Sequence, residues 1–224
     1  MNDLPFYACR LLQRATLKLF AKWEVVGREN IPPMGPLIII ANHQSNMDPP
    51  MLVASLTRRI QFLAKSTVFS NFITRWLLSM YGAFPLDREK DVDIAAYRWV
   101  LSQLREGKPV VLFPEGTRSP GGMIKAKSGF AQIALHAQAP ILPIGITGTE
   151  TMGSWTRVFF PTGKLKINIG TVFSLPDVQG KPNKEIIDSF ADMIMDRVAQ
   201  LLPEDYRGVY GKGKDASTVA PKRR

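Results

Sequence analysis

The sequence predicts an α/β domain built on a mixed, mostly parallel sheet flanked by helices. Two short apolar runs, Leu37–Ala41 and Pro109–Phe113, are nearly continuous, as in strands that are covered on both faces. Segments with helical spacing of apolar residues separate such runs and give a strand–helix–strand alternation. With 224 residues and 45% hydrophobic content, the chain can bury the core of a single domain.

Charge and cysteine content limit the class of protein. The net charge is +10 and the pI is about 9.9, which predicts an anionic partner: nucleic acid, an anionic lipid surface or a phosphorylated substrate. Cys9 is the only cysteine, so no intrachain disulfide can form. The longest apolar runs are shorter than the roughly 20 residues of a membrane-spanning helix, and we find no secretory signal peptide. We therefore expect a protein without a transmembrane segment.

Residues 1–26 predict a basic amphipathic helix that anchors the protein to a membrane. Basic residues recur every four positions and share one face: Arg10, Arg14, Lys18 and Lys22. Apolar residues are expected on the other side: Phe6, Cys9, Leu12, Leu19, Phe20 and Trp23. This composition suits the interface of an anionic bilayer. The alternative is a terminal helix that packs its apolar face on the domain, with Gly27–Gly35 as the joint.

The first predicted strand of the domain, Leu37–Ala41, ends in a polar turn that contains His43 and Asp48. Asp48 precedes Pro49, which favours Asp48 as the N-cap of a helix over about residues 49–56. Ligands bind at the carboxyl ends of strands in α/β sheets, and a histidine turned toward a carboxylate there forms a general base with its orienting partner. The alternative is a solvated histidine beside a simple helix cap.

Further strands and helices are predicted in alternation up to the second continuous apolar run. Strands are expected at residues 59–65 and 82–88, which end at the basic residues Lys65 and Arg88, and helices at 68–81 and 94–105. The strand at 109–113 then leads into a second polar turn. The parallel order places several charged strand ends at one edge of the sheet.

That second turn, residues 114–119 with the sequence PEGTRS, has the groups of a phosphate site. The backbone of Gly116, the hydroxyl of Thr117 and the guanidinium of Arg118 can surround a phosphate. Glu115 is expected to orient Arg118 or to accept a hydrogen bond from a substrate hydroxyl. The alternative is a surface turn with an internal pair of Glu115 and Arg118.

The remaining sequence completes one domain over residues 27–203. Lys125 and Lys127 add positive charge before a helix at about 130–137, in which we interpret His136 as structural. Strands at 140–146 and 164–173 and a helix at 184–202 follow. Residues 204–224 lose the apolar pattern and predict a disordered basic tail.

Four motifs at strand ends occur in one order: NHQSNMD at 42–48, GAFPLDR at 82–88, FPEGTRS at 113–119 and APILPIGI at 139–146. Over roughly residues 35–175 the chain strongly resembles the PlsC-type lysophospholipid acyltransferases, specifically bacterial 1-acyl-sn-glycerol-3-phosphate acyltransferases. The resemblance implies the glycerol-3-phosphate-acyltransferase-like fold. It also implies a catalytic base at His43 with Asp48 as its partner, and phosphate contacts from Arg118, with Lys65 and Arg88 as helpers.

The same resemblance implies a reaction and its partners. An acyl thioester, either acyl-CoA or acyl carrier protein, would acylate lysophosphatidic acid to phosphatidic acid without a cofactor or a metal. The protein would act as a peripheral protein on the cytoplasmic face of the cell membrane, without a nucleic-acid partner.

Several alternatives remain open from the sequence. Within the same family, the acceptor can be another lysolipid. A covalent acyl-enzyme on Ser45 requires His43 to reach a serine two residues away in the same turn, which is awkward geometry. A non-catalytic basic module that binds membranes or nucleic acid explains the charge but not the ordered motifs. A metal-dependent hydrolase is disfavoured because the two histidines lie too far apart in sequence to form a ligand cluster.

Overall fold

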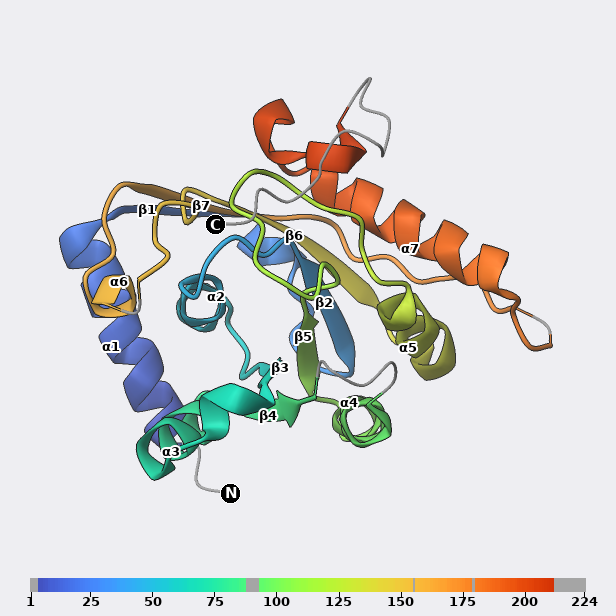
Figure 1. Ribbon diagram of the computed structural model, residues 1–224, viewed down its shortest axis with the longest axis horizontal. Coiled ribbons are helices and arrows are strands. Elements are labelled where there is room, and N and C mark those ends of the chain that lie inside the picture. The colour runs from blue at the N-terminus through green and yellow to red at the C-terminus, as the bar shows by residue number, and fades with distance from the viewer. Residues whose placement is uncertain (1–3, 88–92, 155, 179, 212–224) are drawn as a thin grey trace.

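The structure, a computed structural model of residues 1–224, describes residues 4–87, 93–154, 156–178 and 180–211 (Figure 1). Its described strands form one seven-stranded sheet in the order β1-β7-β6-β2-β5-β3-β4. The strands are β1 (Lys22–Val26), β2 (Leu37–Ala41), β3 (Gln61–Lys65), β4 (Ala83–Leu86), β5 (Pro109–Leu112), β6 (Ile141–Thr147) and β7 (Lys164–Ile169). The helices are α1 (Leu4–Phe20), α2 (Asp48–Ser55), α3 (Phe72–Met80), α4 (Ile94–Arg105), α5 (Gly129–Ala137), α6 (Thr156–Phe159) and α7 (Lys184–Ala199).

The predicted mixed, mostly parallel sheet is confirmed. Strands β6, β2, β5, β3 and β4 pair in parallel, whereas β7 pairs antiparallel with β6 and parallel with β1. The carboxyl ends of five parallel strands therefore lie at one edge of the sheet. The turns that follow β2 and β5, which are neighbours in the sheet, are brought together at this edge.

The core has two parts, one on each face of the sheet, and β2 contributes to both. Leu37, Ile39 and Ala41 pack with α1 and α2, while Ile38 and Ile40 pack with α4, α5 and α7. Figure 1 shows α1 and α2 on one side of the sheet and α4, α5 and α7 on the other. An unbroken apolar strand is thus required at the centre of a sheet covered by helices on both faces.

The N-terminal segment differs from the predicted basic amphipathic helix in where the helix ends, in the position of Arg10 and in which residues the helix buries. The helix ends at Phe20, so Lys22 and Trp23 lie in strand β1 and residues 22–26 belong to the sheet. Arg10 is half-buried and donates a hydrogen bond to the carbonyl of Thr57, so it does not lie on a free basic face. The side of α1 that packs on the domain is the one with these buried residues: Phe6, Gln13 and Leu17. No helix in the described part of the chain is long and apolar enough to cross a bilayer.

Other predicted segments are shorter or divided. The segment 68–81 begins as a 3₁₀ turn, η2 (Ser66–Phe69), before α3, and the strand predicted at 164–173 is regular only over β7. Another 3₁₀ turn, η1 (Arg28–Asn30), lies in the joint at 27–35. The helix predicted at 184–202 is regular only over α7.

The prediction of a disordered tail from residue 204 is wrong for its first residues. Two further 3₁₀ turns, η3 (Glu204–Tyr206) and η4 (Gly208–Tyr210), pack on the domain. The hydroxyl of Tyr206 donates to Glu150, and the hydroxyl of Tyr210 accepts from the backbone N–H of Ala126. Aromatic packing with satisfied hydroxyl groups orders this segment although it lacks an apolar repeat. Residues 212–224 lie outside the described chain.

Candidate active site

His43 and Asp48 meet in the turn between β2 and α2, as the sequence predicts. Nδ1 of His43 lies 2.8 Å from Oδ2 of Asp48. His43 is 8% exposed and Asp48 is fully buried, so neither residue is a solvated turn residue. The buried strand ends just before the pair and α2 begins at Asp48, so both ends of the turn are fixed by the core.

Asp48 is not the N-cap of α2, contrary to the prediction. Met47 occupies that position, and Asp48 is the first helical residue. Its Oδ2 accepts from Nδ1 of His43 and from the backbone N–H groups of Gln44 and Ser45, while Oδ1 accepts from Oγ1 of Thr149. These donors satisfy both oxygens of a carboxylate that is removed from water. The turn before the helix is therefore organised around Asp48.

The His43 ring is fixed in a definite orientation. It stacks on Phe113, with ring centroids 4.3 Å apart and planes inclined by 25°. With Nδ1–H donating to the carboxylate, Nε2 carries the lone pair. No residue in the described ranges forms a hydrogen bond with Nε2. The arrangement leaves an oriented imidazole nitrogen that can accept a proton, on a side chain that is 11% exposed.

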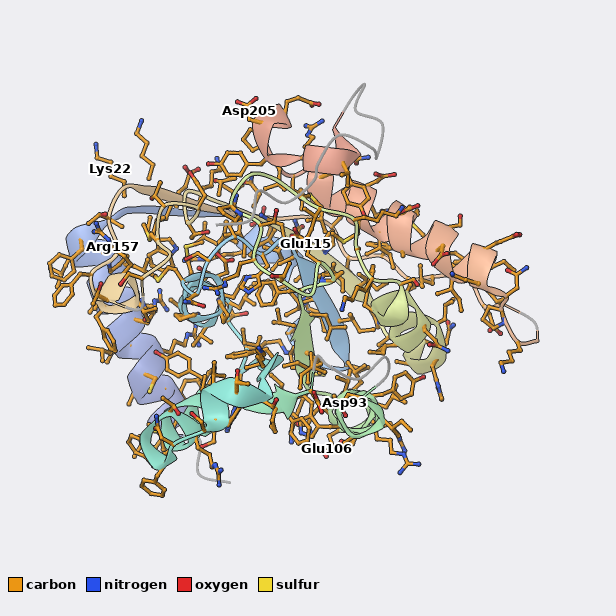
Figure 2. The ribbon with its side chains drawn as sticks, in the orientation of Figure 1. Lys22, Asp93, Glu106, Glu115, Arg157 and Asp205 are labelled. Carbon is orange, nitrogen blue, oxygen red and sulfur yellow. The ribbon has the colours of Figure 1, made fainter. Side chains whose placement is uncertain are left out.

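The two polar turns form one unit through the backbone of His43. The N–H of His43 donates to Oε1 of Glu115 at 2.8 Å, and the carbonyl of His43 accepts from the N–H of Ser119 at 2.7 Å. Oε2 of Glu115 accepts from the N–H of Ile124. Figure 2 labels Glu115 near the centre of the molecule, where it is 3% exposed.

The role predicted for Glu115 is therefore corrected. Its two carboxylate oxygens bind backbone groups of the domain, not Arg118 and not a free site for a substrate. Burial raises the pKa of Glu115 to about 7, although the N–H donors of His43 and Ile124 act in the opposite direction. Glu115 joins the two turns from inside the protein.

Thr149 and Met152, which follow β6, also hold the turn of His43 and were missed from the sequence. Thr149 donates to Asp48, and the carbonyl of Met152 accepts from Oγ of Ser45 at 2.5 Å. Oγ of Ser45 also accepts from the N–H of Met47, and Ser45 is fully buried. The fourth motif ended at Ile146, so applying the strand-end rule a few residues further would have found Thr149.

The PEGTRS turn presents its charged group outward. Gly116 has φ 69°, in the left-handed region, and its N–H donates to the carbonyl of Phe113, so this N–H is not free for a phosphate as predicted. Thr117 and Arg118 are exposed at the same edge, and Lys65 is exposed at the end of β3. Among the residues that the structure describes, no carboxylate pairs with Arg118 or Lys65. Arg88 lies outside the described residues.

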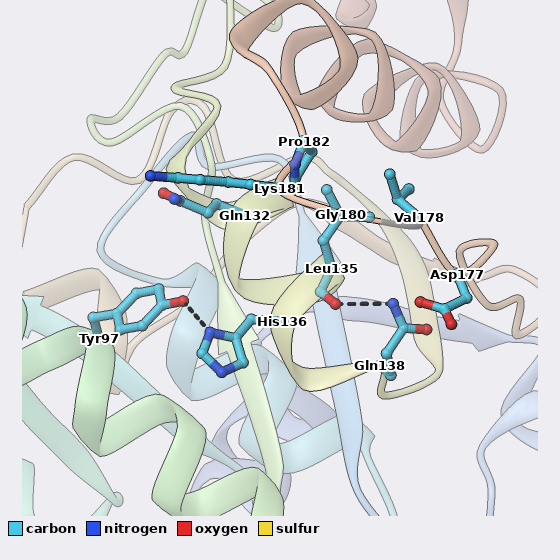
Figure 3. A pocket seen from close by; sticks show the side chains of 10 residues that line it. All are labelled: Tyr97, Gln132, Leu135, His136, Gln138, Asp177, Val178, Gly180, Lys181 and Pro182. Atoms are coloured by element: carbon cyan, nitrogen blue, oxygen red, sulfur yellow. Dashed lines mark hydrogen bonds between the residues drawn. The ribbon is translucent and has the colours of Figure 1, made fainter.

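The second histidine lies in a different place. His136 of α5 is exposed, and its Nδ1 is 2.8 Å from the hydroxyl of Tyr97 of α4. Figure 3 shows this pair at one side of a surface pocket that Gln132 and Lys181 also line. The bonded partner of His136 is thus a phenol, whereas the partner of His43 is a buried carboxylate.

Comparisons with known proteins identify the family of the chain. A family model described as Acyltransferase matches residues 22–147, more than half of the chain. A 1-acyl-sn-glycerol-3-phosphate acyltransferase of Chlamydomonas reinhardtii is 32% identical over 84% of this chain and 55% of its own length. A Bacillus subtilis protein of the same name is 28% identical over 86% of this chain and 94% of its own length. The chain spans about half the length of the algal relative and of a chloroplastic relative from Brassica napus, at 55% for each.

A solved structure has the same fold. The crystal structure of the 1-acyl-sn-glycerophosphate acyltransferase PlsC from Thermotoga maritima superposes with a TM-score of 0.68 and 27% sequence identity. The match covers 88% of this chain and 78% of the crystallised chain.

Proposed function

The chain belongs to the acyltransferase family, and we propose that it transfers a fatty acyl group from an acyl thioester to lysophosphatidic acid, giving phosphatidic acid. The observation that carries this proposal is the oriented His43, whose free Nε2 lies at the strand edge that also carries Arg118 and Lys65. A base beside a cationic turn suits an acceptor with a hydroxyl to deprotonate and a phosphate to anchor. Relatives of both bacterial and eukaryotic origin have names that agree with this acceptor.

In the proposed reaction, Nε2 of His43 takes the proton of the acceptor hydroxyl as the oxygen attacks the thioester carbonyl. Asp48 keeps the ring in the required tautomer and stabilises the positive charge that forms on it. The tetrahedral intermediate then collapses, the carbon–sulfur bond breaks, and the imidazolium returns the proton to the leaving thiolate. The thioester supplies the driving force, so the residues of the chain act only as base, orienting group and anchor.

A covalent route through Ser45 receives no support from the geometry. Oγ of Ser45 is buried and donates to the carbonyl of Met152, whereas Nδ1 of His43 is engaged by Asp48. A nucleophilic serine requires its hydroxyl to be open to the substrate and bonded to the base. Direct attack by the acceptor hydroxyl is therefore the proposed mechanism.

Arg118 and Lys65 would bind the acceptor phosphate, with Thr117 nearby. Both cations are exposed at the carboxyl edge of neighbouring strands, where a phosphate can approach. A phosphate bound by these residues would hold the reacting hydroxyl oxygen of the acceptor near His43. Positioning of this kind lowers the activation barrier by several kcal/mol. The donor, acyl-CoA or acyl carrier protein, carries phosphate in either case.

We further propose that α1 rests on the cytoplasmic face of the cell membrane. Its outward side is apolar and largely exposed, as these fractions show: Leu4 70%, Leu11 71%, Leu12 60% and Leu19 75%. This side is turned away from the residues that pack on the domain, so α1 both supports the fold and presents apolar surface to lipid. Exposed aromatic residues continue the surface on α3 and near α6: Phe72, Trp76, Phe159 and Phe160.

One assay tests the proposed reaction. Purified protein is mixed with acyl-CoA or acyl carrier protein and, in turn, with lysophosphatidic acid, glycerol 3-phosphate or lysophosphatidylethanolamine. We expect thiol release and phosphatidic acid with the first acceptor, and no transfer by His43→Ala. This variant should fold because the bonds of His43 to Glu115 and Ser119 use its backbone and not its ring. Turnover restricted to another acceptor would overturn the proposed substrate, and a fully active His43→Ala would overturn the proposed base.

A further inference from the structure

The two lysines after the PEGTRS turn have different surroundings. The ammonium of Lys125 pairs with the carboxylate of Asp192 on α7 and lies 6.0 Å from the ring centroid of Tyr210. Lys127 has no carboxylate partner within the part of the chain that the structure describes. Its positive charge is thus not compensated by the domain.

A backbone hydrogen bond holds Lys127 beside the turn. Its backbone N–H donates to the carbonyl of Pro114 at 2.9 Å, which keeps this segment beside the turn. Its Cε and Cδ lie 3.2 and 3.3 Å from the point that a Cβ atom on Gly116 would occupy, and its Nζ lies 3.7 Å from that point. Glycine at position 116 therefore permits both the left-handed turn and the close approach of the Lys127 stem.

An ammonium held in this way is prepared to bind an anion. Arg118 follows Gly116 by two residues, so the turn that the Lys127 side chain approaches also carries a second cation. Like charges that share a small region repel each other, and a phosphate bound between them removes the repulsion. Lys127 is exposed, so its ammonium is open to a ligand that approaches this turn.

We propose that Lys127 is a further substrate-binding residue, whose ammonium binds a phosphate group at the turn of Gly116 and Arg118. The proposal rests on the proposed acyl transfer and adds a residue to its anchoring site. The phosphate can belong to the lysophosphatidic acid acceptor or to the acyl donor, and kinetic measurements separate these sources.

The test compares three variants of the full-length chain. Lys127→Met keeps an unbranched apolar stem and removes the charge, and Lys127→Arg keeps the charge. Lys125→Met removes the neighbouring charge that is already paired with Asp192. Losing a charge-assisted contact should raise a Michaelis constant on the order of tenfold in Lys127→Met. We expect Lys127→Arg to remain within about threefold of the parent and Lys125→Met to match it.

The affected substrate assigns the phosphate. A raised KM for lysophosphatidic acid supports contact with the acceptor, and a raised KM for acyl-CoA supports contact with the donor. Unchanged values for both substrates, or equal losses in Lys127→Met and Lys125→Met, would overturn the proposal.

A second measurement separates this proposal from the proposed reaction. Binding of lysophosphatidic acid and of CoA is measured by calorimetry, each ligand alone, so that no turnover is needed. If the parent binds either ligand more tightly than Lys127→Met does, the proposal stands even where the parent fails to acylate the acceptor. Equal dissociation constants of parent and variant for both ligands would refute it.

Discussion

Replacing Asp48 by asparagine tests whether its charge, rather than its shape, is needed. The carboxamide oxygen can take the place of Oδ2 and still accept from Nδ1 of His43 and from the N–H groups of Gln44 and Ser45. The amide nitrogen then faces Oγ1 of Thr149, and a hydroxyl can accept as well as donate. We therefore expect Asp48→Asn to fold with the imidazole in place but without the buried negative charge.

The size of the effect follows from the geometry of the pair. Nδ1 and Oδ2 are 2.8 Å apart, and Asp48 is fully buried. Unit charges centred about 4 Å apart, at an effective dielectric constant of about 20, attract each other by about 4 kcal/mol. Loss of this attraction from a transition state that carries an imidazolium slows the reaction roughly 10³-fold. The KM of the acceptor should change little, because Asp48 faces the interior.

The assay measures thiol release from acyl-CoA with lysophosphatidic acid, together with urea unfolding of each variant. Asp48→Ala is the control for the hydrogen bonds, since it leaves the N–H groups of Gln44 and Ser45 without their acceptor and should lower the free energy of unfolding by about 2 kcal/mol or more. A folded Asp48→Asn with kcat within tenfold of the parent would show that the charge contributes little, and the role assigned to Asp48 would fail.

Three further predictions concern the phosphate turn, the buried glutamate and the outer side of α1. Arg118→Ala should raise the KM of lysophosphatidic acid, because about 1.5–3 kcal/mol of binding free energy is lost with the charge-assisted contact. An effect on the donor's KM alone would assign Arg118 to the donor. The pKa of Glu115 is raised from 4.5 to about 7, so the folded protein holds this proton more tightly than the unfolded chain. The free energy of unfolding of the parent should therefore fall relative to Glu115→Gln as pH rises from about 4.5 to about 7, and identical pH profiles in urea would contradict this. The double variant Leu11→Gln/Leu19→Gln should lose roughly 3 kcal/mol or more of binding free energy for anionic vesicles, measured by co-sedimentation. Its turnover of a short-chain soluble acceptor should stay constant. Equal loss of vesicle binding and of turnover would indicate a structural role for these exposed leucines.

The sheet and the contact between His43 and Asp48 could be predicted because their signals are local. A strand buried on both faces needs an unbroken apolar run, and β2 has one. The five-residue separation of His43 and Asp48 lies within one turn, so no distant contact was needed to bring them together. Parallel strands place their carboxyl ends at one edge of the sheet, so the polar residues that follow these strands are expected to meet there.

The roles of Glu115 and α1 could not be obtained in this way. A glutamate in a charged turn has the composition of a surface residue. Here it is buried, and its carboxylate accepts from the N–H groups of Ile124 and of His43, which lies 72 residues earlier in the chain. Helical periodicity likewise marks apolar positions in α1 without stating which of them meet the domain. Phe6 and Leu17 do, whereas Leu12 and Leu19, which were predicted for the same side as Phe6, remain exposed.

The connection between the two turns has a consequence for how catalysis and anchoring depend on each other. The N–H and the carbonyl of His43 both bind the second turn, through Glu115 and Ser119. A displacement of the PEGTRS turn therefore displaces the backbone of His43, the proposed base. Protonation of Glu115 makes one carboxylate oxygen an O–H donor and a weaker acceptor, so the bond from either His43 or Ile124 is weakened. Changes buried in the second turn should thus lower kcat, whereas changes at its exposed cations should act mainly on KM, because only the former alter the position of His43.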